Sequence, residues 1–419
     1  MVKILRIKDI VDTISLTHKF NKDMLIAINT SDVENGVMHE GTLTLVQDLK
    51  GQFKKTIKKN DILYSEIRPA NRRFALVTKD DCSDYVVSTK LMVLRKKNKD
   101  VDLKYLYYCL TNQPFLDMLQ RRAENRIGSF PQITFNLLSE YAFYIPLLEE
   151  QKRISNVISF IDRKIELNKR INDNLEAMAK QLYDYWFVQF DFPNEEGEPY
   201  KSSGGVMVWN EKLKHEIPQK WSDCVLGDYI GRITNGLNPR KNFVLGSGNN
   251  YYVTIRSLVG TTIDWNNCDR CDDEALSKIN SRSQLQIGDI IFSAIGTIGR
   301  TYYILEEPTN WNISETSFTL RAKENVPNDF FYGMLRSNEI QIKADKAAMG
   351  STLRCLVMDS LCSLQYIEIP SYMMKLFAAK VSPLYRQIHR NNKEIAELTK
   401  QRDELLPLLM NGQASVNSD

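Results

Sequence analysis

The sequence lacks the features that mark several common functional classes. No apolar run approaches the roughly 20 residues that a membrane-spanning helix needs, and the first residues, MVKILR, are unlike a secretory signal, so we expect a cytoplasmic protein. No Pro-Pro pair occurs, although amino-methyltransferases need a motif such as Asn/Asp-Pro-Pro-Tyr/Phe to hold the target amino group. A Gly-x-x-x-x-Gly-Lys-Ser/Thr phosphate loop is also absent.

Cysteine and histidine are scarce. The seven cysteines form an odd, scattered set that fits reduced thiols better than a disulfide framework. Cys268 and Cys271 have the spacing of metal ligands, but no second Cys/His pair lies at a matching distance, so we expect no metal site. The four isolated histidines also disfavour a Ser or Cys nucleophile activated by a histidine base. We therefore expect a protein without catalytic activity.

The sequence does contain an internal duplication. Residues 60–67 (NDILYSEI) correspond to residues 288–295 (GDIIFSAI) at an offset of 228 residues. Further matches at offsets of 222 to 226 join residues 87–89 with 313–315, 105–107 with 330–332, 128–129 with 350–351, and 145–146 with 369–370. At 419 residues and 43% hydrophobic composition, the chain can bury two cores of normal domain size. The pattern predicts two similar globular domains in one polypeptide.

A long helix with heptad spacing is predicted after each domain. Residues 149–187 contain no Gly or Pro, and their seam side chains recur at alternating steps of four and three. The first seam is Ile154, Ile158, Ile161, Ile165, Asn168, Asn172, Leu175, Ala179 and Leu182, and the second is Leu384, Ile388, Asn391, Ile395, Leu398, Arg402, Leu405 and Leu409. We expect the helices to pair with each other; the alternative is that each packs only on its own domain.

A polar linker, residues 188–220, follows the first helix and lets the chain turn, so that the helices can lie antiparallel with the domains at opposite ends. The seam from Ile154 to Leu182 covers 28 residue steps, or about 42 Å at roughly 1.5 Å per residue. That length matches roughly a dozen base pairs at about 3.4 Å each. The helix pair is therefore a candidate spacer.

Within each domain, short apolar runs between turn signals predict strands, and helical patterns cover residues 102–120 and 329–344. The predicted strands are residues 61–67, 75–78, 90–94 and 141–145 in the first domain, and residues 251–255, 289–294, 301–305 and 317–321 in the second. The expected fold class is α+β, with two pseudo-repeated mixed α/β domains separated by an antiparallel two-helix coiled coil.

The net charge of +3 does not by itself indicate a nucleic-acid partner. Residues 1–148 carry 23 Lys and Arg against 17 Asp and Glu, whereas residues 211–370 carry 17 against 19. Because charged runs are usually solvated faces, this excess supports a phosphate-binding surface only weakly, and only in the first domain.

Three segments resemble the central conserved region of specificity subunits of Type I restriction-modification enzymes. They are residues 146–154 (PLLEEQKRI), 160–168 (FIDRKIELN) and 179–187 (AKQLYDYWF). The stretch from Ile217-Pro218 to Trp221 and the Gly-Ser loops at 128 and 350 are similar as well. The resemblance covers nearly the whole chain and respects its duplication.

This resemblance implies a DNA-binding protein whose two target recognition domains each read one half of a bipartite, asymmetric site on double-stranded DNA. The coiled coil between them would bind two methylation subunits, and restriction subunits would join the full complex. The chain itself would hold no cofactor, because S-adenosylmethionine, ATP and Mg are implied for the partner subunits that methylate adenine and cut DNA. The implied domains are residues 1–148 and 221–375 for target recognition, 149–187 and 376–411 for the conserved helices, 188–220 for the linker and 412–419 for a flexible tail.

Several loops are candidates for contact with DNA. Residues 68–73 follow a predicted strand, and Pro69 and Asn71 indicate an exposed turn whose donors suit guanine, adenine and phosphate. The candidate DNA-binding residues are Arg68, Asn71, Arg72, Arg73, Arg126, Ser129 and Gln132 in the first domain, and Asn238, Arg240, Lys241, Thr297, Arg300, Ser351, Thr352 and Arg354 in the second. The alternative for any one of them is that its glycine neighbours only make turns and its charge only keeps the loop soluble. Because corresponding loops differ, we predict an asymmetric target.

An aromatic cluster, Tyr183, Tyr185, Trp186 and Phe187, ends the first helix and exceeds what one seam can bury. We interpret it as a docking surface for methylation subunits; the alternative is packing against Phe190 and Phe192 of the linker. Two other classes of protein stay open at this point. A stand-alone methyltransferase or nuclease would act on DNA as a purified chain, and a coiled-coil scaffold would lack steeply salt-dependent DNA affinity.

Overall fold

The structure is a computed structural model that describes residues 3–49, 51–125, 131–240 and 242–414. The chain divides into two compact units, the first comprising Met1–Glu166 and Ala396–Asp419 and the second Leu167–Ile395. Both units combine strands and helices, which confirms the α+β class. None of the helices in the described part of the chain combines the length and apolarity that a membrane crossing requires.

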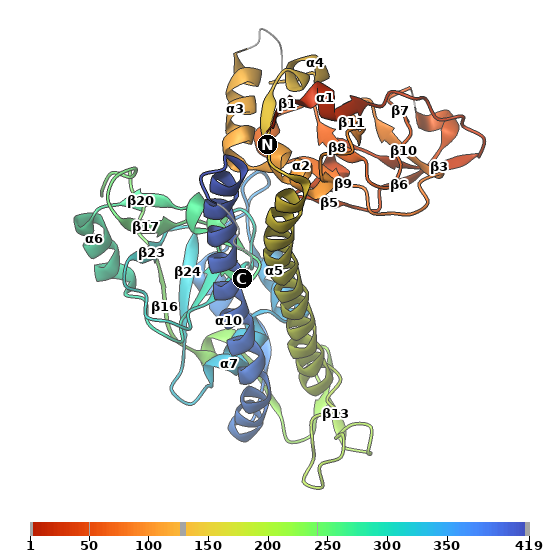
Figure 1. Ribbon diagram of the computed structural model, residues 1–419. Coiled ribbons are helices and arrows are strands. Elements are labelled where there is room, and N and C mark those ends of the chain that lie inside the picture. The colour runs from red at the N-terminus through yellow and green to blue at the C-terminus, as the bar shows by residue number, and fades with distance from the viewer. Residues whose placement is uncertain (1–2, 50, 126–130, 241, 415–419) are drawn as a thin grey trace. The chain divides into compact units, whose positions relative to one another are not determined.

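The first unit contains two four-stranded sheets (Figure 1). The first sheet is antiparallel and contains, in order, β2 (Val11–Thr13), β11 (Leu91–Lys96), β8 (Ile62–Ser65) and β9 (Phe74–Leu76). The second contains β6 (Thr42–Leu45), β3 (Met24–Ile28), β10 (Tyr85–Ser88) and β7 (Phe53–Lys55), with β3 and β10 parallel. All four residues of β8 are buried, because alternate side chains enter cores on opposite faces of the strand.

Shorter elements complete the first unit. The first strand, β1 (Lys3–Arg6), pairs antiparallel with the last strand, β12 (Ala142–Ile145), and β4 (Val33–Glu34) forms a hairpin with β5 (Val37–Met38). Two short helices, α1 (Ile7–Ile10) and α4 (Phe135–Ser139), are also present.

The second unit repeats this plan. Its antiparallel sheet contains, in order, β16 (Ile230–Asn235), β24 (Ser317–Ala322), β21 (Ile290–Ser293) and β22 (Thr301–Tyr303). Its other main sheet contains β20 (Asp269–Cys271), β17 (Asn250–Val253) and β23 (Trp311–Ile313), with β17 and β23 parallel. A pair of strands, β15 (Ser222–Val225) and β25 (Gln365–Glu368), matches β1 and β12 of the first unit.

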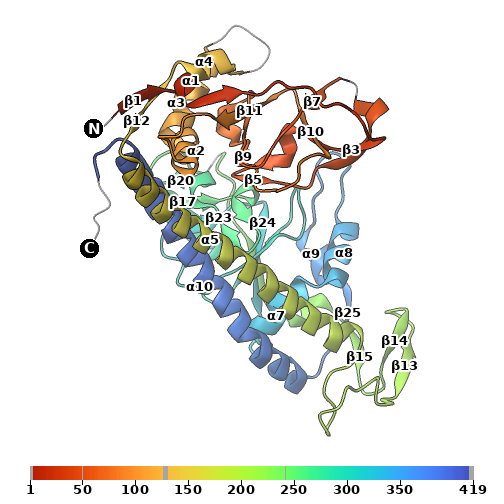
Figure 2. The same ribbon diagram turned by 45° about the vertical axis from the view of Figure 1, so that its right-hand side comes forward.

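The remaining elements of the second unit are short. The predicted linker contains a hairpin, β13 (Met207–Asn210) and β14 (His215–Pro218), which Figure 2 shows clearly. The second unit also contains β18 (Leu258–Val259), β19 (Thr262–Ile263), α6 (Asp273–Ser283) and α9 (Met358–Cys362).

The predicted helix 102–120 is two helices, and so is its counterpart. The first unit has α2 (Leu103–Thr111) and α3 (Gln113–Glu124), and the second has α7 (Asn328–Leu335) and α8 (Asn338–Ala347). Asn112 has extended backbone geometry and caps α3 by accepting a hydrogen bond from the Phe115 amide. Ser337 caps α8 in the same way. The signal was present in the sequence, since Asn112 precedes Gln113 and Pro114 and proline favours the first helical turn.

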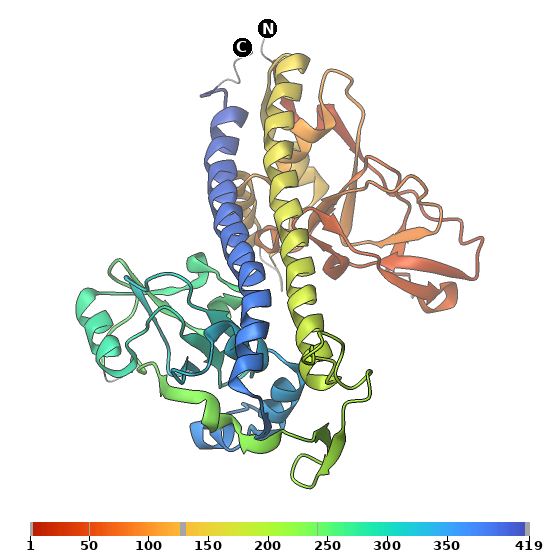
Figure 3. The ribbon, with the colours of Figure 1, turned by 90° about the horizontal axis from the view of Figure 1, so that it is seen from below.

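The two long helices, α5 (Leu148–Tyr183) and α10 (Ser371–Met410), run side by side, as Figure 3 shows. In the first unit Asp162 of α5 accepts a hydrogen bond from Arg402 of α10 at 3.0 Å. In the second unit Asn168 donates to Glu394, and Asn391 donates to Asn172, each at 2.8 Å. Along these contacts the residue number increases on α5 while it decreases on α10. The predicted pairing of the helices is confirmed, and their direction is antiparallel.

The seam residues differ in burial. On α5 the buried ones are Ile154, Ile158, Ile161, Ile165, Asn168, Asn172 and Ala179, with Leu175 and Leu182 half-buried; on α10 Ile388, Asn391 and Leu409 are buried, with Leu384, Ile395, Leu398 and Arg402 half-buried. Leu405 is wrong as a seam position, because it is 38% exposed while Leu406 is 6% exposed. A straight helix has 3.6 residues per turn, so its buried face drifts away from a strict heptad repeat. The seam position after Arg402 is therefore four residues further on, at Leu406, and not three residues further on, at Leu405.

Candidate nucleic-acid interface

The structure brings two of the predicted loops of the first unit together. The loop after β8 contains Arg68 and Arg72 in left-handed backbone conformations, with φ of 44° and 53°, around a short 3₁₀ turn, Pro69–Asn71. The Arg68 amide donates a hydrogen bond to the Pro131 carbonyl at 3.0 Å, and Ile67 forms a β-bridge with Gln132. Left-handed non-glycine residues are strained and cluster at functional sites.

The second unit holds its corresponding loops together in the same way. The Gly296 amide donates to the Arg354 carbonyl at 2.8 Å, and Ile295 forms a β-bridge with Cys355. Gly299 is left-handed, with a φ of 87°, and a Cβ atom there would lie 2.0 Å from the Gln341 side chain. Each unit therefore presents a pair of joined loops at the end of its central strand, on one scaffold but with different side chains.

Two arginine side chains that the sequence predicts to contact DNA make hydrogen bonds within the protein instead. The guanidinium of Arg73 donates to the Ser31 carbonyl at 2.8 Å, and that of Arg300 donates to the carbonyls of Ile255 and Leu258, each at 3.0 Å. The main chain of each arginine is bound in the same way in both units. The Ser65 amide donates to the Arg73 carbonyl, and the Ser293 amide donates to the Arg300 carbonyl. These two arginines are equivalent, and their side chains clamp main-chain carbonyls within their own units.

Other candidate side chains are held by neighbours. Arg72 donates to Gln113 at 2.6 Å, Gln132 donates to Glu66 at 2.8 Å and Asn238 donates to Glu315 at 2.6 Å. Arg354 forms an ion pair of 3.0 Å with Asp345. Sequence reasoning missed these supporting residues. A signal existed for Glu66 and Glu315, since both belong to the duplicated motifs.

A few candidates are exposed and uncommitted. Within the described residues, no side-chain hydrogen bond or ion pair is recorded for Asn71, Arg240, Thr297, Ser351 or Thr352, all of which are exposed. Arg68 is also exposed and has an interaction of its own. Arg126, Ser129 and Lys241 lie outside the described residues. The exposed donors fall in both loop pairs and in the loop that begins at Asn238.

The aromatic cluster at the end of α5 lies mostly in the core of the second unit. Tyr183, Trp186 and Phe187 are 2%, 6% and 3% exposed, and all three rings pack against Phe377 at centroid distances of 5.2 to 5.8 Å. Tyr183 also hydrogen-bonds the Tyr366 hydroxyl. Burial therefore corrects the docking interpretation for these three residues, because a core side chain presents no surface to a partner. Only Tyr185, at 37% exposure, keeps an accessible ring.

No metal site is built around Cys268 and Cys271. Cys271 is buried, and Cys268 is half-buried with its Sγ 3.4 Å from the Asp264 carbonyl. Burial raises the pKa of both thiols, which disfavours the thiolate that a metal would need. Across the described ranges, no group of three or more His, Cys, Asp or Glu side chains is arranged to hold a metal ion.

These features define a duplicated protein with two loop-bearing α+β domains and an internal antiparallel helix pair. Residues 2–177 match the family model of the Type I restriction modification DNA specificity domain. The chain is 28% identical to the Type I restriction enzyme HindI specificity subunit of Haemophilus influenzae, over 97% of this chain and 98% of that one. It is also 28% identical to the MjaIX specificity subunit of Methanocaldococcus jannaschii, over 75% of this chain and 69% of that one.

A solved structure supports the fold. The S subunit of a Type-I restriction-modification system from M. genitalium has a TM-score of 0.53 and 17% identity, covering 98% of this chain and 96% of that chain. Over nearly its whole length, the chain is similar to a Type I restriction-modification specificity subunit. The matching family model describes a DNA specificity domain, and both relatives are specificity subunits.

Proposed function

We propose that each unit reads one half of a bipartite, asymmetric site on double-stranded DNA. The duplicated loop pair carries this proposal. The same amide-to-carbonyl hydrogen bond joins residues 68 and 131 in the first unit and residues 296 and 354 in the second, while the exposed side chains differ. Unlike donors on a shared scaffold suit unlike base sequences, because each base pair shows its own pattern of donors and acceptors in the major groove.

The proposed division of the chain rests on its duplication and on the two long helices. Residues 1–148 and 221–375 are the target recognition domains, residues 149–187 and 376–411 are the conserved helices that set the spacing, and residues 188–220 and 412–419 are linker and tail. The chain holds no cofactor of its own in this proposal. Adenine methylation with S-adenosylmethionine, and restriction with ATP and Mg, occur in the methylation and restriction subunits of the full complex.

The exposed face of α5 supports docking of two methylation subunits on the helices. Leu167 and Met178 are each 53% exposed, and a separation of eleven residues places them on one face of a helix. Tyr185 follows in the last, π-helical turn. Large exposed apolar side chains in a row mark interaction surfaces. We therefore move the proposed docking surface from the buried rings to Leu167, Met178 and Tyr185.

The reading function is tested by co-expression with methylation subunits, followed by mapping of the modified adenines. We expect a bipartite, non-palindromic target. Asn71→Ala should relax base preference in one half-site only, and Thr297→Ala in the other. A palindromic target, or methylation or cleavage of DNA by the purified chain alone, would contradict the proposal.

The docking surface is tested separately. Leu167→Lys/Met178→Lys should abolish co-purification of methylation subunits while leaving the melting temperature of the chain unchanged. Lys169→Glu changes the charge at an exposed position on a different face of α5 and serves as the control. Intact assembly of the double variant would remove this surface from the proposal.

A further inference from the structure

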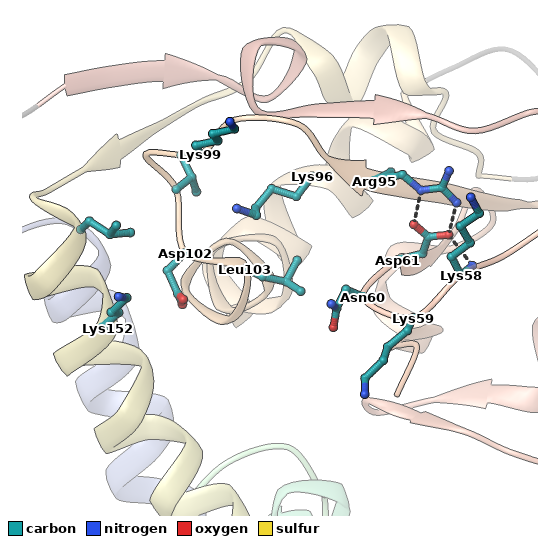
Figure 4. Close-up of a pocket in the computed structure, with 12 residues that line it drawn as sticks. Lys58, Lys59, Asn60, Asp61, Arg95, Lys96, Lys99, Asp102, Leu103 and Lys152 are labelled. Atoms are coloured by element: carbon teal, nitrogen blue, oxygen red, sulfur yellow. Dashed lines mark hydrogen bonds and ion pairs between the residues drawn. The ribbon is translucent and has the colours of Figure 1, made fainter. Parts of the chain in front are cut away.

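A basic pocket of about 500 Å³ lies in the first unit, away from the predicted DNA-reading loops (Figure 4). Six basic side chains line it, Lys58, Lys59, Arg95, Lys96, Lys99 and Lys152, against two acidic ones, Asp61 and Asp102. Figure 4 shows that they come from the turn before β8, the end of β11 with its following loop, and the first turns of α5. Three separate segments thus converge on one hollow.

Both acidic side chains of the pocket already accept hydrogen bonds from other groups of the protein. Asp61 accepts two hydrogen bonds of 2.7 Å from Arg95, and Asp102 caps α2 by accepting from the Tyr105 amide at 2.9 Å. Lys59 pairs with Asp80, which does not line the pocket. Within the described part of the chain, no ion pair is recorded for Lys58, Lys99 or Lys152. The pocket therefore holds several ammonium groups with no internal counter-charge.

The duplication shows that the fold does not require the basic residues at positions 58, 59 and 96. The second unit repeats the buried ion pair as Asp289 with Arg321, in the same strand register. The positions that match Lys58, Lys59 and Lys96 are Gln286, Ile287 and Ala322. The same scaffold is thus stable with no basic residue at these three positions. These three lysines of the first unit therefore need an explanation other than folding.

We propose that this pocket is a phosphate-binding site and that its ligand is the backbone of DNA outside the bases that are read. The uncommitted cations are all lysines, which bind phosphate as compact point charges, whereas the arginine fork that suits carboxylates is used by Asp61. The lysine ammonium groups would contact a DNA phosphate and not a base edge. This contact would therefore add affinity for DNA without a preference for base sequence.

The position of the pocket fits this role. Asp61 precedes β8 and the loop from Arg68 follows it, so the pocket and the reading loop lie near opposite ends of this four-residue strand. At about 3.3 Å per residue the strand is roughly 13 Å long, which corresponds to about four base pairs of duplex. The choice of DNA as the phosphate source rests on the proposed function, whereas the phosphate chemistry of the pocket does not.

The test compares two double variants of equal charge in the complex with methylation subunits. Lys99→Gln/Lys152→Gln removes two exposed pocket lysines, and Lys19→Gln/Lys54→Gln removes two exposed lysines of the same unit that do not line the pocket. Duplex affinity is measured between about 50 and 200 mM salt, and pyrophosphate binding is measured by calorimetry. Equal melting temperatures of both variants and the parent chain verify folding.

We expect the pocket variant alone to lower the log–log salt slope by about 2, with equal loss of affinity for target and non-target duplexes. Loss of pyrophosphate binding with an unchanged slope would support the site and assign it to a free phosphorylated ligand. If neither quantity differs from the control, the proposal is overturned. Loss of methylation subunits with both quantities unchanged would also overturn it, in favour of an acidic protein surface. A parent complex that binds all duplexes equally would refute the reading function and leave the pocket comparison intact.

Discussion

Arg95 and Asp61 form a two-point ion pair, with both N–H···O distances at 2.7 Å and the Asp61 side chain 1% exposed. Asp61 also accepts from the Lys58 amide, and Asp289 repeats the arrangement with Arg321 and the Gln286 amide. The carboxylate thus joins a turn to the two central strands of each sheet.

Removing the arginine leaves the carboxylate buried and unpaired. Arg95→Met should lower the free energy of unfolding by about 3 kcal/mol, at the low end for a broken buried pair because the arginine is one-third exposed. Chemical denaturation of the chain measures this loss. Lys97→Met removes an exposed ion pair with Asp12 and should cost less than about 1 kcal/mol. Equal losses in the two variants would refute the structural role of the buried pair.

The asparagines of the helix seam act as a network. Asn391 donates to Asn172, which in turn donates to Asn392, both at 2.8 Å. Asn391→Leu should cost about 1 to 3 kcal/mol, because the Asn172 oxygen loses its partner at a buried position. Asn172→Leu/Asn391→Leu should recover most of that loss, as apolar seam residues stabilise paired helices. Strict additivity in the thermodynamic cycle would show that the two asparagines do not interact.

The aromatic cluster separates core residues from surface residues. Trp186→Ala should lower the free energy of unfolding by about 3 to 5 kcal/mol, since it empties a buried site against Phe377. Tyr185→Ala should change stability by less than about 0.5 kcal/mol, which is typical of exposed positions. Thermal melting of both variants decides this. Normal stability of the Trp186 variant would contradict the observed packing.

The arginine clamps predict a stability effect in place of a specificity effect. Arg300→Lys should weaken the unit, because one ammonium on a flexible chain is poorly matched to the two carbonyls that the guanidinium bonds. The rough cost is about 1 to 2 kcal/mol, as for other hydrogen bonds made by charged groups. The set of methylated target sequences should stay the same. A changed target sequence with unchanged stability would make Arg300 a base-reading residue instead.

Asp329 predicts a pH effect in the second unit. Burial raises the pKa of this carboxyl above its usual 3.8, although Arg386 and the Tyr303 hydroxyl act in the opposite direction. The folded state therefore binds the proton more tightly than the unfolded state, and ionisation weakens folding as pH rises from about 4 through the higher folded pKa. Asp329→Asn should become more stable relative to the parent chain over that window. Parallel pH profiles in denaturant titrations would show that the shift is absent.

The sequence alone determined the duplication, the α+β class and the pairing of the long helices. These features depend on local periodicity and on matched motifs, and both can be read directly from the amino-acid sequence. The strands β8 and β21 were visible as apolar runs because both of their faces are buried. The Asn seam positions were visible because polar residues interrupted a regular heptad.

The tertiary structure decided which side chains are available. Arg73 and Arg300 look like exposed loop donors in the sequence, but both bond carbonyls far away in the chain. Trp186 looks like a surface ring until Phe377 and its neighbours cover it. Lysines spread from residue 58 to residue 152 meet in one pocket only after folding. Availability depends on contacts between distant segments, and no local pattern encodes those contacts.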